Sequence, residues 1–511
     1  MLVALARGSL DATPLTDTAR GAAEAMSESR STMTASRQGS GRAPRVGEHA
    51  VVIGASVAGL LAARVLSDAY ERVTIVERDE LPPVGEGRKA VPQGRHAHVM
   101  LASGLRATEA LLPGITDELL ADGARPCESL RQIRLVISGH ELCREASGAD
   151  VLLASRPLIE GHIRRRVLAL ENVVVRERCE AAELVASPDR KRVSGVRIRP
   201  RDGSGIEEIC NADLSVAASG RSARIPALLE ALGYRRPEEE RLPVDLLYVS
   251  RRLRLCPGAL GDDKLVLIGA RPGLPRGLAL IAQEDHWIVT ACGYGSEHHP
   301  PKDEDGYLEF IRTVAPPEVA AAIRDAEPLG ELATHGFPSN QRRRYDRLKR
   351  FPDGLLAVGD AVVSFNPLYG QGMSVAALEA VELRQCLEQG NRRLARRFFR
   401  AAGNVITPAW EMAVGGDLAL PEVEGDRPLT LRLTNAYMER LLQVAEQDAV
   451  VAAAFNDVAD LLAPPRRIMR PRVLWRVLRG PRQRRPMLAA DPPAGSLQRA
   501  AIVHGRSSEE A

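Results

Sequence analysis

Two glycines and an acidic residue near the start of the chain have the types and spacing of a phosphate-binding turn. Gly54 and Gly59 are the first and third glycines of a G-x-G-x-x-G pattern in which Ser56 takes the middle position, and Glu77 follows Gly59 by 18 residues. Gly54 permits the tight turn, and Gly59 permits close helix–strand packing. A helix N-terminus placed here offers free N–H groups to a pyrophosphate, while Glu77 can accept hydrogen bonds from ribose hydroxyls. The pattern therefore predicts a dinucleotide site.

A second constellation lies some 300 residues further on, in GDAVVSFNPLYGQGMS, from Gly359 to Ser374. Asp360 offers a carboxylate to a polyol hydroxyl or, through water, to a phosphate. The glycine turn from Gly370 to Gly372 leads into a helix whose N-terminus would face negative charge developing on a reduced flavin. A nicotinamide dinucleotide needs no such second site, whereas an extended FAD does, so the pair of sites favours FAD.

Alternating strand and helix patterns must position these residues. Residues 50–53 and 73–76 are predicted as buried parallel strands on either side of a helix. Strand patterns then recur between residues 240 and 345 without a second glycine fingerprint. The predicted fold is therefore α/β: a Rossmann-like FAD-binding domain with an inserted antiparallel-sheet substrate domain and a C-terminal helical region, of the glutathione-reductase and hydroxybenzoate-hydroxylase type.

The expected domain organisation has six parts. They are a disordered N-terminal extension (1–46), the first part of the FAD-binding domain (47–225, with some substrate-domain strands near 125–150), the substrate-binding domain (226–345), the second part of the FAD-binding domain (346–400), a C-terminal helical region (401–490) and a disordered tail (491–511).

Composition excludes several classes of protein. The 511 residues carry a net charge of +3, yet residues 464–487 contain nine arginines and no acid, so the rest of the chain is net acidic and a nucleic-acid partner is not expected. The seven cysteines are scattered, which favours reduced thiols in a cytoplasmic protein. No apolar run reaches transmembrane length. His96 and His98 lack a third ligand, so no metal site is expected. The basic stretch 464–487 is amphipathic and suggests weak contact with a membrane or carrier protein, or a helix packed on the main body.

Four segments, in order along the chain, carry a resemblance to a known family. GASVAG with Glu77, the QGRHAH loop, the SGRSAR turn and GDAVVSFNPLYGQGMS resemble the motifs of FAD-dependent monooxygenases of the aromatic-hydroxylase and squalene-epoxidase kind. The nearest resemblance is to bacterial flavin epoxidases and hydroxylases that act on polyketide and terpenoid intermediates. With the arguments above, it implies non-covalent FAD contacts for the following residues: Gly54, Ala55, Ser56, Ala58, Gly59, Glu77, Arg78, Arg95, Arg156, Gly220, Gly359, Asp360, Pro367, Gly370, Gln371, Gly372 and Met373.

The resemblance also implies the reaction. In such enzymes one oxygen atom of O₂ is transferred to the substrate through a flavin C4a-hydroperoxide, with NAD(P)H as the electron donor, directly or through a separate flavin reductase. Ser219-Gly220 stands where aromatic hydroxylases carry an Asp-Gly pair linked to NADPH, which favours a separate reductase or transient binding. No catalytic base stands out, and alkene epoxidation tolerates that lack better than phenol hydroxylation does.

The expected function is therefore epoxidation of a hydrophobic alkene in the secondary metabolism that supplies antibiotics. Aromatic (phenol) hydroxylation is the first alternative. Reduction or cyclisation of an isoprenoid chain on the same fold is the second. A flavoprotein that binds a partner without turnover is a third, which intact motifs disfavour.

Overall fold

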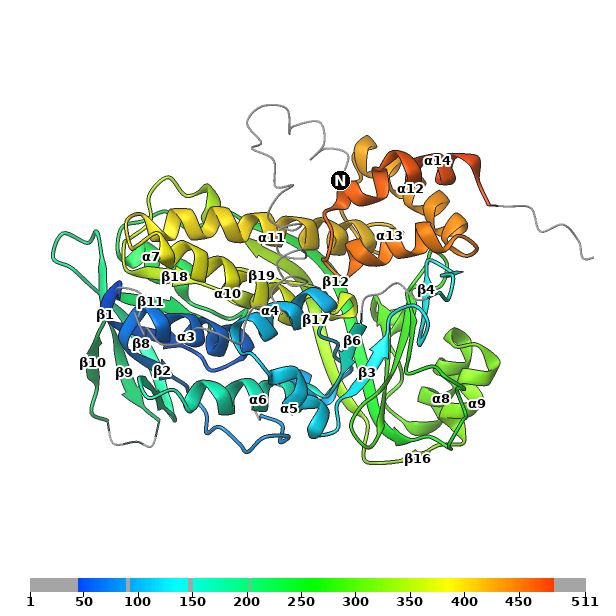
Figure 1. The fold of residues 1–511 in the computed structure, drawn as a ribbon, viewed down its shortest axis with the longest axis horizontal. Helices are drawn as coiled ribbons and strands as arrows, with labels where there is room; N and C mark the ends of the chain where they lie inside the picture. The colour runs from blue at the N-terminus through cyan, green and yellow to red at the C-terminus, as the bar shows by residue number, and fades with distance from the viewer. Residues whose placement is uncertain (1–44, 89–91, 146–149, 202, 204, 482–511) are drawn as a thin grey trace, which may run out of the picture.

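The computed structural model describes residues 45–88, 92–145, 150–201, 203 and 205–481. Its N-terminal half is built on a five-stranded parallel sheet (Figure 1). Across that sheet the strand order is β18 (Leu355–Ala357), β11 (Leu214–Ala217), β1 (Gly47–Ile53), β2 (Tyr70–Val76) and β7 (Val173–Arg176). In the three central strands, residues 50–53, 73–76 and 214–217 are mostly apolar and almost all buried, as expected for a parallel sheet covered on both faces. The expected α/β fold is confirmed.

Helices cover one face of this sheet and a small antiparallel meander lies beside it. The helices are α3 (Val57–Ala69), α4 (Ala102–Leu111), α5 (Ile115–Ala121), α6 (Arg156–Leu168), α7 (Ile225–Ala231) and α10 (Gly372–Glu388). The meander consists of β8 (Cys179–Ala186), β9 (Val193–Pro200) and β10 (Glu208–Asn211). Helix α3 packs between α10 and α6, so the segment after residue 354 returns to lie beside the segment that starts at residue 47.

A second, nine-stranded sheet forms the other half of the molecule. Its strands run in the order β19 (Val363–Ser364), β17 (Ala333–Arg343), β12 (Glu239–Arg254), β15 (Trp287–Tyr294), β14 (Arg276–Ala282), β13 (Leu265–Ile268), β4 (Ile133–Ile137) and β5 (His140–Glu141), with β16 (Glu327–Pro328) paired to β12. The pairs are antiparallel except β13 with β4, which is parallel. The sheet is therefore mixed at the place where residues 133–141 join it. A two-stranded ribbon of β3 (Arg125–Glu128) and β6 (Asp150–Leu153) stands beside it.

Two groups of helices close the second half. Helices α8 (Glu304–Val314) and α9 (Pro317–Arg324) pack Tyr307, Phe310 and Ile323 against one face of the large sheet. Four C-terminal helices lie above the molecule in Figure 1: α11 (Leu394–Asp417), α12 (Leu429–Ala445), α13 (Ala449–Ala459) and α14 (Pro471–Arg479).

The ends of the chain fall largely outside the described residues. This holds for most of the expected extension 1–46, for the tail 491–511 and for residues 482–487 of the basic stretch. Within the part that the structure describes, no helix is both long and apolar enough to cross a bilayer.

Candidate active site

A cavity of about 1500 Å³ runs between the parallel sheet, the large sheet and the C-terminal helices. Pockets for one small molecule usually measure about 300–1,000 Å³. The cavity therefore has room for a cofactor and a substrate together. It falls into two parts that differ in lining: a nucleotide part along the parallel sheet, and a substrate part along the large sheet and the C-terminal helices.

The nucleotide part begins at the turn between β1 and α3. Gly54 has a φ of +105°, and a Cβ atom there would lie 2.6 Å from the carbonyl oxygen of Ala218. A Cβ atom on Gly59 would lie 1.9 Å from the carbonyl oxygen of Gly54. Ser56 is the N-cap of α3, and its side chain makes no capping hydrogen bond. The first N–H groups of α3 are therefore left to a ligand, which is the arrangement that binds a pyrophosphate.

Glu77 directly follows β2 and is buried at the edge of this turn. Its carboxylate accepts hydrogen bonds from Ala55 N (2.8 Å) and Asp79 N (3.1 Å) and pairs with Arg88 at 2.7 Å. Arg88 also pairs with Glu160 of α6 at 3.0 Å and donates to the carbonyl oxygen of Ala55. Its Oε2 atom contacts both Ala55 N and Arg88, whereas Oε1 accepts only from Asp79 N, so one lone pair of Oε1 remains for a ribose hydroxyl.

Arg95 lies in the loop between β2 and α4. It ends the 3₁₀ turn η1 (Pro92–Arg95), its side chain is exposed, and it is not among the described residues that line the cavity. Arg88, seven residues earlier in the same loop, is the arginine that reaches the turn. Loop spacing alone gave no reason to prefer Arg88 over Arg95, because irregular segments have no period that fixes which side chains point inward.

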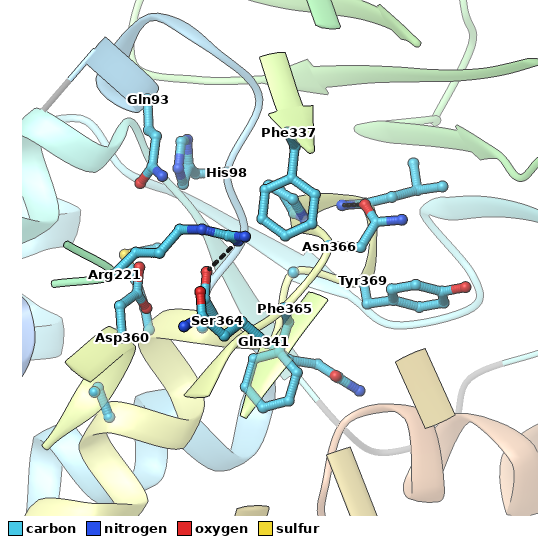
Figure 2. Close-up of a pocket in the computed structure, with 18 of the residues that line it drawn as sticks. Gln93, His98, Arg221, Phe337, Gln341, Asp360, Ser364, Phe365, Asn366 and Tyr369 are labelled. Carbon is cyan, nitrogen blue, oxygen red and sulfur yellow. Dashed lines mark hydrogen bonds between the residues drawn. The ribbon is translucent and has the colours of Figure 1, made fainter. Parts of the chain in front are cut away.

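The flavin end of the nucleotide part is built from β18 and α10. Gly359 and Asp360 form the turn η4 (Gly359–Ala361) directly after β18, and Asp360 faces the cavity opposite Gln93 and His98 (Figure 2). Burial raises the pKa of Asp360, while the charges of Arg156 and Arg221 lower it. The segment that follows ends in the turn η5 (Pro367–Tyr369), after which Gly370 adopts a φ of +63° and α10 begins.

The polar groups at this end fit an FAD. The buried Gln371 Oε1 atom and the Arg156 Nε atom have no hydrogen-bond partner in the described structure. Ideal Cβ atoms on Gly220 and Gly372 would meet nothing within 4 Å, so a ligand can approach the backbone at both positions. Among the described residues these are the open backbone and the unsatisfied donors and acceptors that a flavin ring, ribityl chain and pyrophosphate require.

Most of the predicted FAD-contact residues are brought together here. The cavity is lined by fifteen of them: Gly54, Ala55, Ser56, Ala58, Glu77, Arg78, Arg156, Gly220, Gly359, Asp360, Pro367, Gly370, Gln371, Gly372 and Met373. Gly59 lies behind the turn, where it permits close packing of α3. Only Arg95, of the seventeen, points away from it. The assignment of each residue to a particular FAD atom stays a prediction.

The substrate part of the cavity is lined mainly by apolar side chains. They come from β4, β13, β14 and β17 of the large sheet and from α11, α12 and α13: Leu135, Leu265, Leu267, Ile281, Phe337, Met412, Leu431, Met438, Leu442 and Phe455. Such a lining excludes water from a reacting centre and accepts a hydrophobic molecule.

A buried carboxylate stands at the junction of the two parts, and the sequence did not reveal it. Asp417, at the end of α11, accepts hydrogen bonds from the hydroxyls of Tyr294 (2.9 Å) and Tyr369 (3.0 Å). The side-chain amides of Asn366 (2.9 Å) and Asn340 (2.6 Å) donate to it as well. Burial raises the pKa of Asp417 to about 6, although these donors lower it. The cluster unites four segments far apart in the chain (around residues 294, 340, 366–369 and 417), so no local spacing could have indicated it.

Three histidines line the cavity near the same junction, and burial lowers the pKa of each of them. His96 bonds through Nδ1 to Ser250 Oγ at 2.7 Å, and His98 bonds to the carbonyl oxygen of His96. Burial lowers the pKa of His96 to about 4 and that of His98 to about 3, and it also lowers the pKa of His335. A search of the described residues finds no group of three or more side chains able to hold a metal ion.

Glu379 is a buried residue of α10 that contacts the backbone of the turn at the flavin end. Its Oε2 atom accepts the backbone N–H of Gly359 at 2.7 Å, and its Oε1 atom has no hydrogen-bond partner in the described structure. Burial raises the pKa of Glu379 to about 8; the hydrogen bond from Gly359 opposes this and the charge of Asp360 adds to it. Near neutral pH, Glu379 is therefore mostly protonated.

We expect Glu379→Gln to change how stability depends on pH. The folded-state pKa lies above the ordinary glutamate value of 4.5, so the folded chain binds this proton more tightly. Wild-type stability therefore declines as pH rises between the two pKa values, by up to about 1.4 kcal/mol per pH unit. Glutamine does not titrate and keeps an acceptor for Gly359. The variant should therefore gain stability relative to wild type between about pH 5 and pH 8.

Urea unfolding at a series of pH values measures this difference. Glu388→Gln, at an exposed position of the same helix, is the matched control and should run parallel to wild type. Parallel curves for Glu379→Gln as well would mean that Glu379 is ionised in the folded chain.

The fold, the backbone and polar groups that fit FAD, and the apolar part of the cavity define the class: this protein is an enzyme of the aromatic-hydroxylase-like superfamily of FAD-dependent monooxygenases. Residues 48–392 match the family described as FAD binding domain, and the chain belongs to that family.

The chain is also similar to individual proteins of known sequence or structure. The chain is 38% identical to Protein Rv3254 of Mycobacterium tuberculosis, over 81% of this chain and 90% of that protein. It is 26% identical to the kynurenine 3-monooxygenase of Salinispora tropica, over 77% of this chain and 84% of that enzyme. Among solved structures, p-nitrophenol 4-monooxygenase PnpA of Pseudomonas putida has the same fold, with a TM-score of 0.55 and 16% identity over 86% of this chain and all of that one.

Proposed function

We propose that this enzyme inserts one oxygen atom from O₂ into a large hydrophobic natural-product intermediate, with alkene epoxidation as the reaction. The observation that carries the proposal is the apolar chamber beside the nucleotide part of the cavity. It is large and mostly aliphatic, so it suits a substrate that binds by burying apolar surface. Electrophilic oxygen transfer to an alkene needs no protein base, which fits the aliphatic side chains of the chamber wall.

The chain's own residues would bind and orient FAD and would keep water away from the reacting atoms. The free N–H groups of α3 hold the pyrophosphate, Glu77 holds the adenosine ribose, and Asp360 orients the polyol or a phosphate-bound water. The turn from Gly370 to Gly372 presents backbone N–H groups to the pyrimidine end of the flavin, and the apolar wall excludes water. FAD supplies the activation of O₂ and the chain supplies the site in which it takes place.

NAD(P)H is the proposed electron donor, through a separate flavin reductase or by transient binding. The support is that the described residues form only one parallel sheet of the kind that binds a dinucleotide, and we assign that sheet to FAD. Stopped-flow mixing of the FAD-loaded enzyme with NADPH alone tests this. Slow reduction that a flavin reductase accelerates is the expected result, and rapid reduction without reductase or substrate would contradict it. We further propose that the protein works in the cytoplasm without a nucleic-acid partner.

Labelled oxygen separates the candidate reactions. Reduced enzyme is supplied with ¹⁸O₂ and with polyenes or phenols, and the products are read by mass spectrometry. One labelled oxygen in an epoxide supports the proposal. An unlabelled saturated or cyclised product would instead identify an isoprenoid reductase or cyclase.

Phenol hydroxylation is the second candidate, and one observation favours it. The hydroxyls of Tyr294 and Tyr369 belong to side chains that line the cavity, and both donate to Asp417. A phenol is more reactive toward electrophilic oxygen as its phenolate, and a hydroxyl chain that ends on a carboxylate can take up the phenolic proton. A labelled phenol in the same experiment would move the assignment to this reaction.

A further inference from the structure

The C-terminal helices carry large apolar side chains on their outer surface. Leu429 and Leu433 of α12 are 67% and 54% exposed, and Trp475 and Leu478 of α14 are 60% and 71% exposed. They make up half of the large hydrophobic side chains that are exposed in the described part of the chain. The two helices pack against each other. A soluble domain rarely concentrates exposed apolar residues in one region without a binding role.

Helix α14 has two distinct faces. Val473 and Val477 are buried against the neighbouring helices, as expected for a helix packed on the main body. The opposite face carries Trp475 and Leu478, and the guanidinium of Arg479 lies 5.1 Å from the centre of the Trp475 ring. Packing therefore accounts for only one face, and the other presents an aromatic ring, an aliphatic side chain and a cation outward.

The charge around this face has one sign. Residues 464–481 contain six arginines and no acidic residue. Arg467 pairs with Asp457, and Arg476 pairs with Asp448. No ion pair within the described residues involves the remaining four: Arg466, Arg470, Arg472 and Arg479. Cations beside exposed apolar side chains are the composition of a helix that lies in the interface of an anionic bilayer.

The same layer of helices closes the substrate part of the cavity. Leu431 and Met438 of α12 line the cavity, while Leu429 and Leu433 of the same helix are exposed. Helix α12 therefore has apolar side chains on both its inner and its outer faces. The thickness of one helix separates the apolar chamber from the exposed apolar surface.

We propose that α14, with the outer face of α12, docks the enzyme on an anionic lipid membrane, from which a hydrophobic substrate can enter through the helical layer. Uniform positive charge, a tryptophan and aliphatic side chains complement anionic headgroups and the acyl boundary below them. The docking itself does not depend on which reaction the enzyme catalyses.

Vesicle flotation with the full-length, FAD-loaded protein tests this proposal. We expect the protein to float with vesicles of phosphatidylcholine and phosphatidylglycerol, but not with phosphatidylcholine alone, and to be released by high salt. The double variant Arg472→Gln/Arg479→Gln should bind about 30-fold more weakly. Trp475→Ser/Leu478→Ser should also bind more weakly. All four side chains are exposed, so the melting temperature should stay close to that of wild type.

Matched controls change the same number of residues elsewhere. Arg199→Gln/Arg236→Gln removes two exposed cations from the nucleotide half, where their side chains are 51% and 57% exposed. Val174→Ser/Ile209→Ser removes two exposed apolar side chains from the same half. Both controls should float like wild type.

Failure to float with anionic vesicles would overturn the proposal, as would equal losses in the controls. A concentration-dependent dimer that Trp475→Ser/Leu478→Ser abolishes, without vesicle binding by wild type, would show instead that this face joins two copies of the chain. The flotation experiment does not depend on the outcome of the labelled-oxygen experiment. The membrane proposal and the proposed reaction can therefore be contradicted independently of each other.

Discussion

Gly59→Ala should abolish retention of FAD and lower the stability of the whole nucleotide half. The new Cβ atom would lie 1.9 Å from the carbonyl oxygen of Gly54, where no flexible side chain can move aside. The turn from β1 to α3 must therefore shift, and overpacking of this kind typically costs about 1–3 kcal/mol, with larger losses where backbone must move. The same shift moves the N–H groups that face the pyrophosphate. FAD content after gel filtration and the midpoint of urea unfolding measure the two effects.

Gly403→Ala is the matched control. Gly403 lies inside α11, and a Cβ atom there would meet nothing within 4 Å. Alanine is the better helix former, so this variant should keep its FAD and gain about 0.5–1 kcal/mol of stability. If Gly59→Ala bound FAD as well as Gly403→Ala does, the turn would not have the backbone geometry described above.

Asp417→Ala should destabilise the junction between the two halves by about 3–5 kcal/mol, because four hydrogen bonds lose their shared acceptor. The carboxylate is fully buried and is the shared acceptor for Tyr294, Tyr369, Asn366 and Asn340. Alanine leaves four buried donors without that acceptor, and each unsatisfied group costs about 1–3 kcal/mol unless water enters. Denaturant unfolding of the purified variant measures the loss.

Two further variants sharpen the result. Asp285→Ala removes a carboxylate that is 88% exposed and pairs only with His286 among the described residues, so it should unfold like wild type. Asp417→Asn keeps the volume but places an amide donor among existing donors, so its stability should lie between those of wild type and Asp417→Ala. Equal stability of Asp417→Ala and Asp285→Ala would mean that the cluster adds nothing to the fold.

The nucleotide part was predictable because its signals are local. A glycine turn between two apolar strands, and a glycine pair before a helix, each specify their own backbone within about twenty residues. Glu77, Asp360 and Gly372 therefore line the cavity as their motifs predicted. The helical C-terminal region follows from the same kind of local pattern.

The junction was not predictable, for a physical reason. Asp417 lies in an unremarkable helix end, and only the packing of α11 against β15, β17 and the turn η5 turns it into a buried acceptor. The exposed position of Arg95 was not predictable either, because loops have no periodicity that fixes the direction of a side chain; its contact with FAD stays a prediction. The parallel pairing of β4 with β13 was equally hidden, since it depends on a contact across more than 120 residues of sequence.

The long pairing of β12 with β17 has a mechanical consequence. The two strands pair from Glu239–Arg343 to Ser250–Ala333, and at one end Arg343 donates to the carbonyl oxygens of Arg221 and Ala361 in the nucleotide half. The paired strands therefore connect the two halves as a rigid two-stranded ribbon. A hinge motion between the halves would have to break many of its backbone hydrogen bonds at once. The walls of the chamber on this side are therefore stiff. We therefore expect large molecules to enter and leave the chamber through the layer of C-terminal helices, which is held in place by side-chain packing. We do not expect a hinge motion between the two halves to open the chamber.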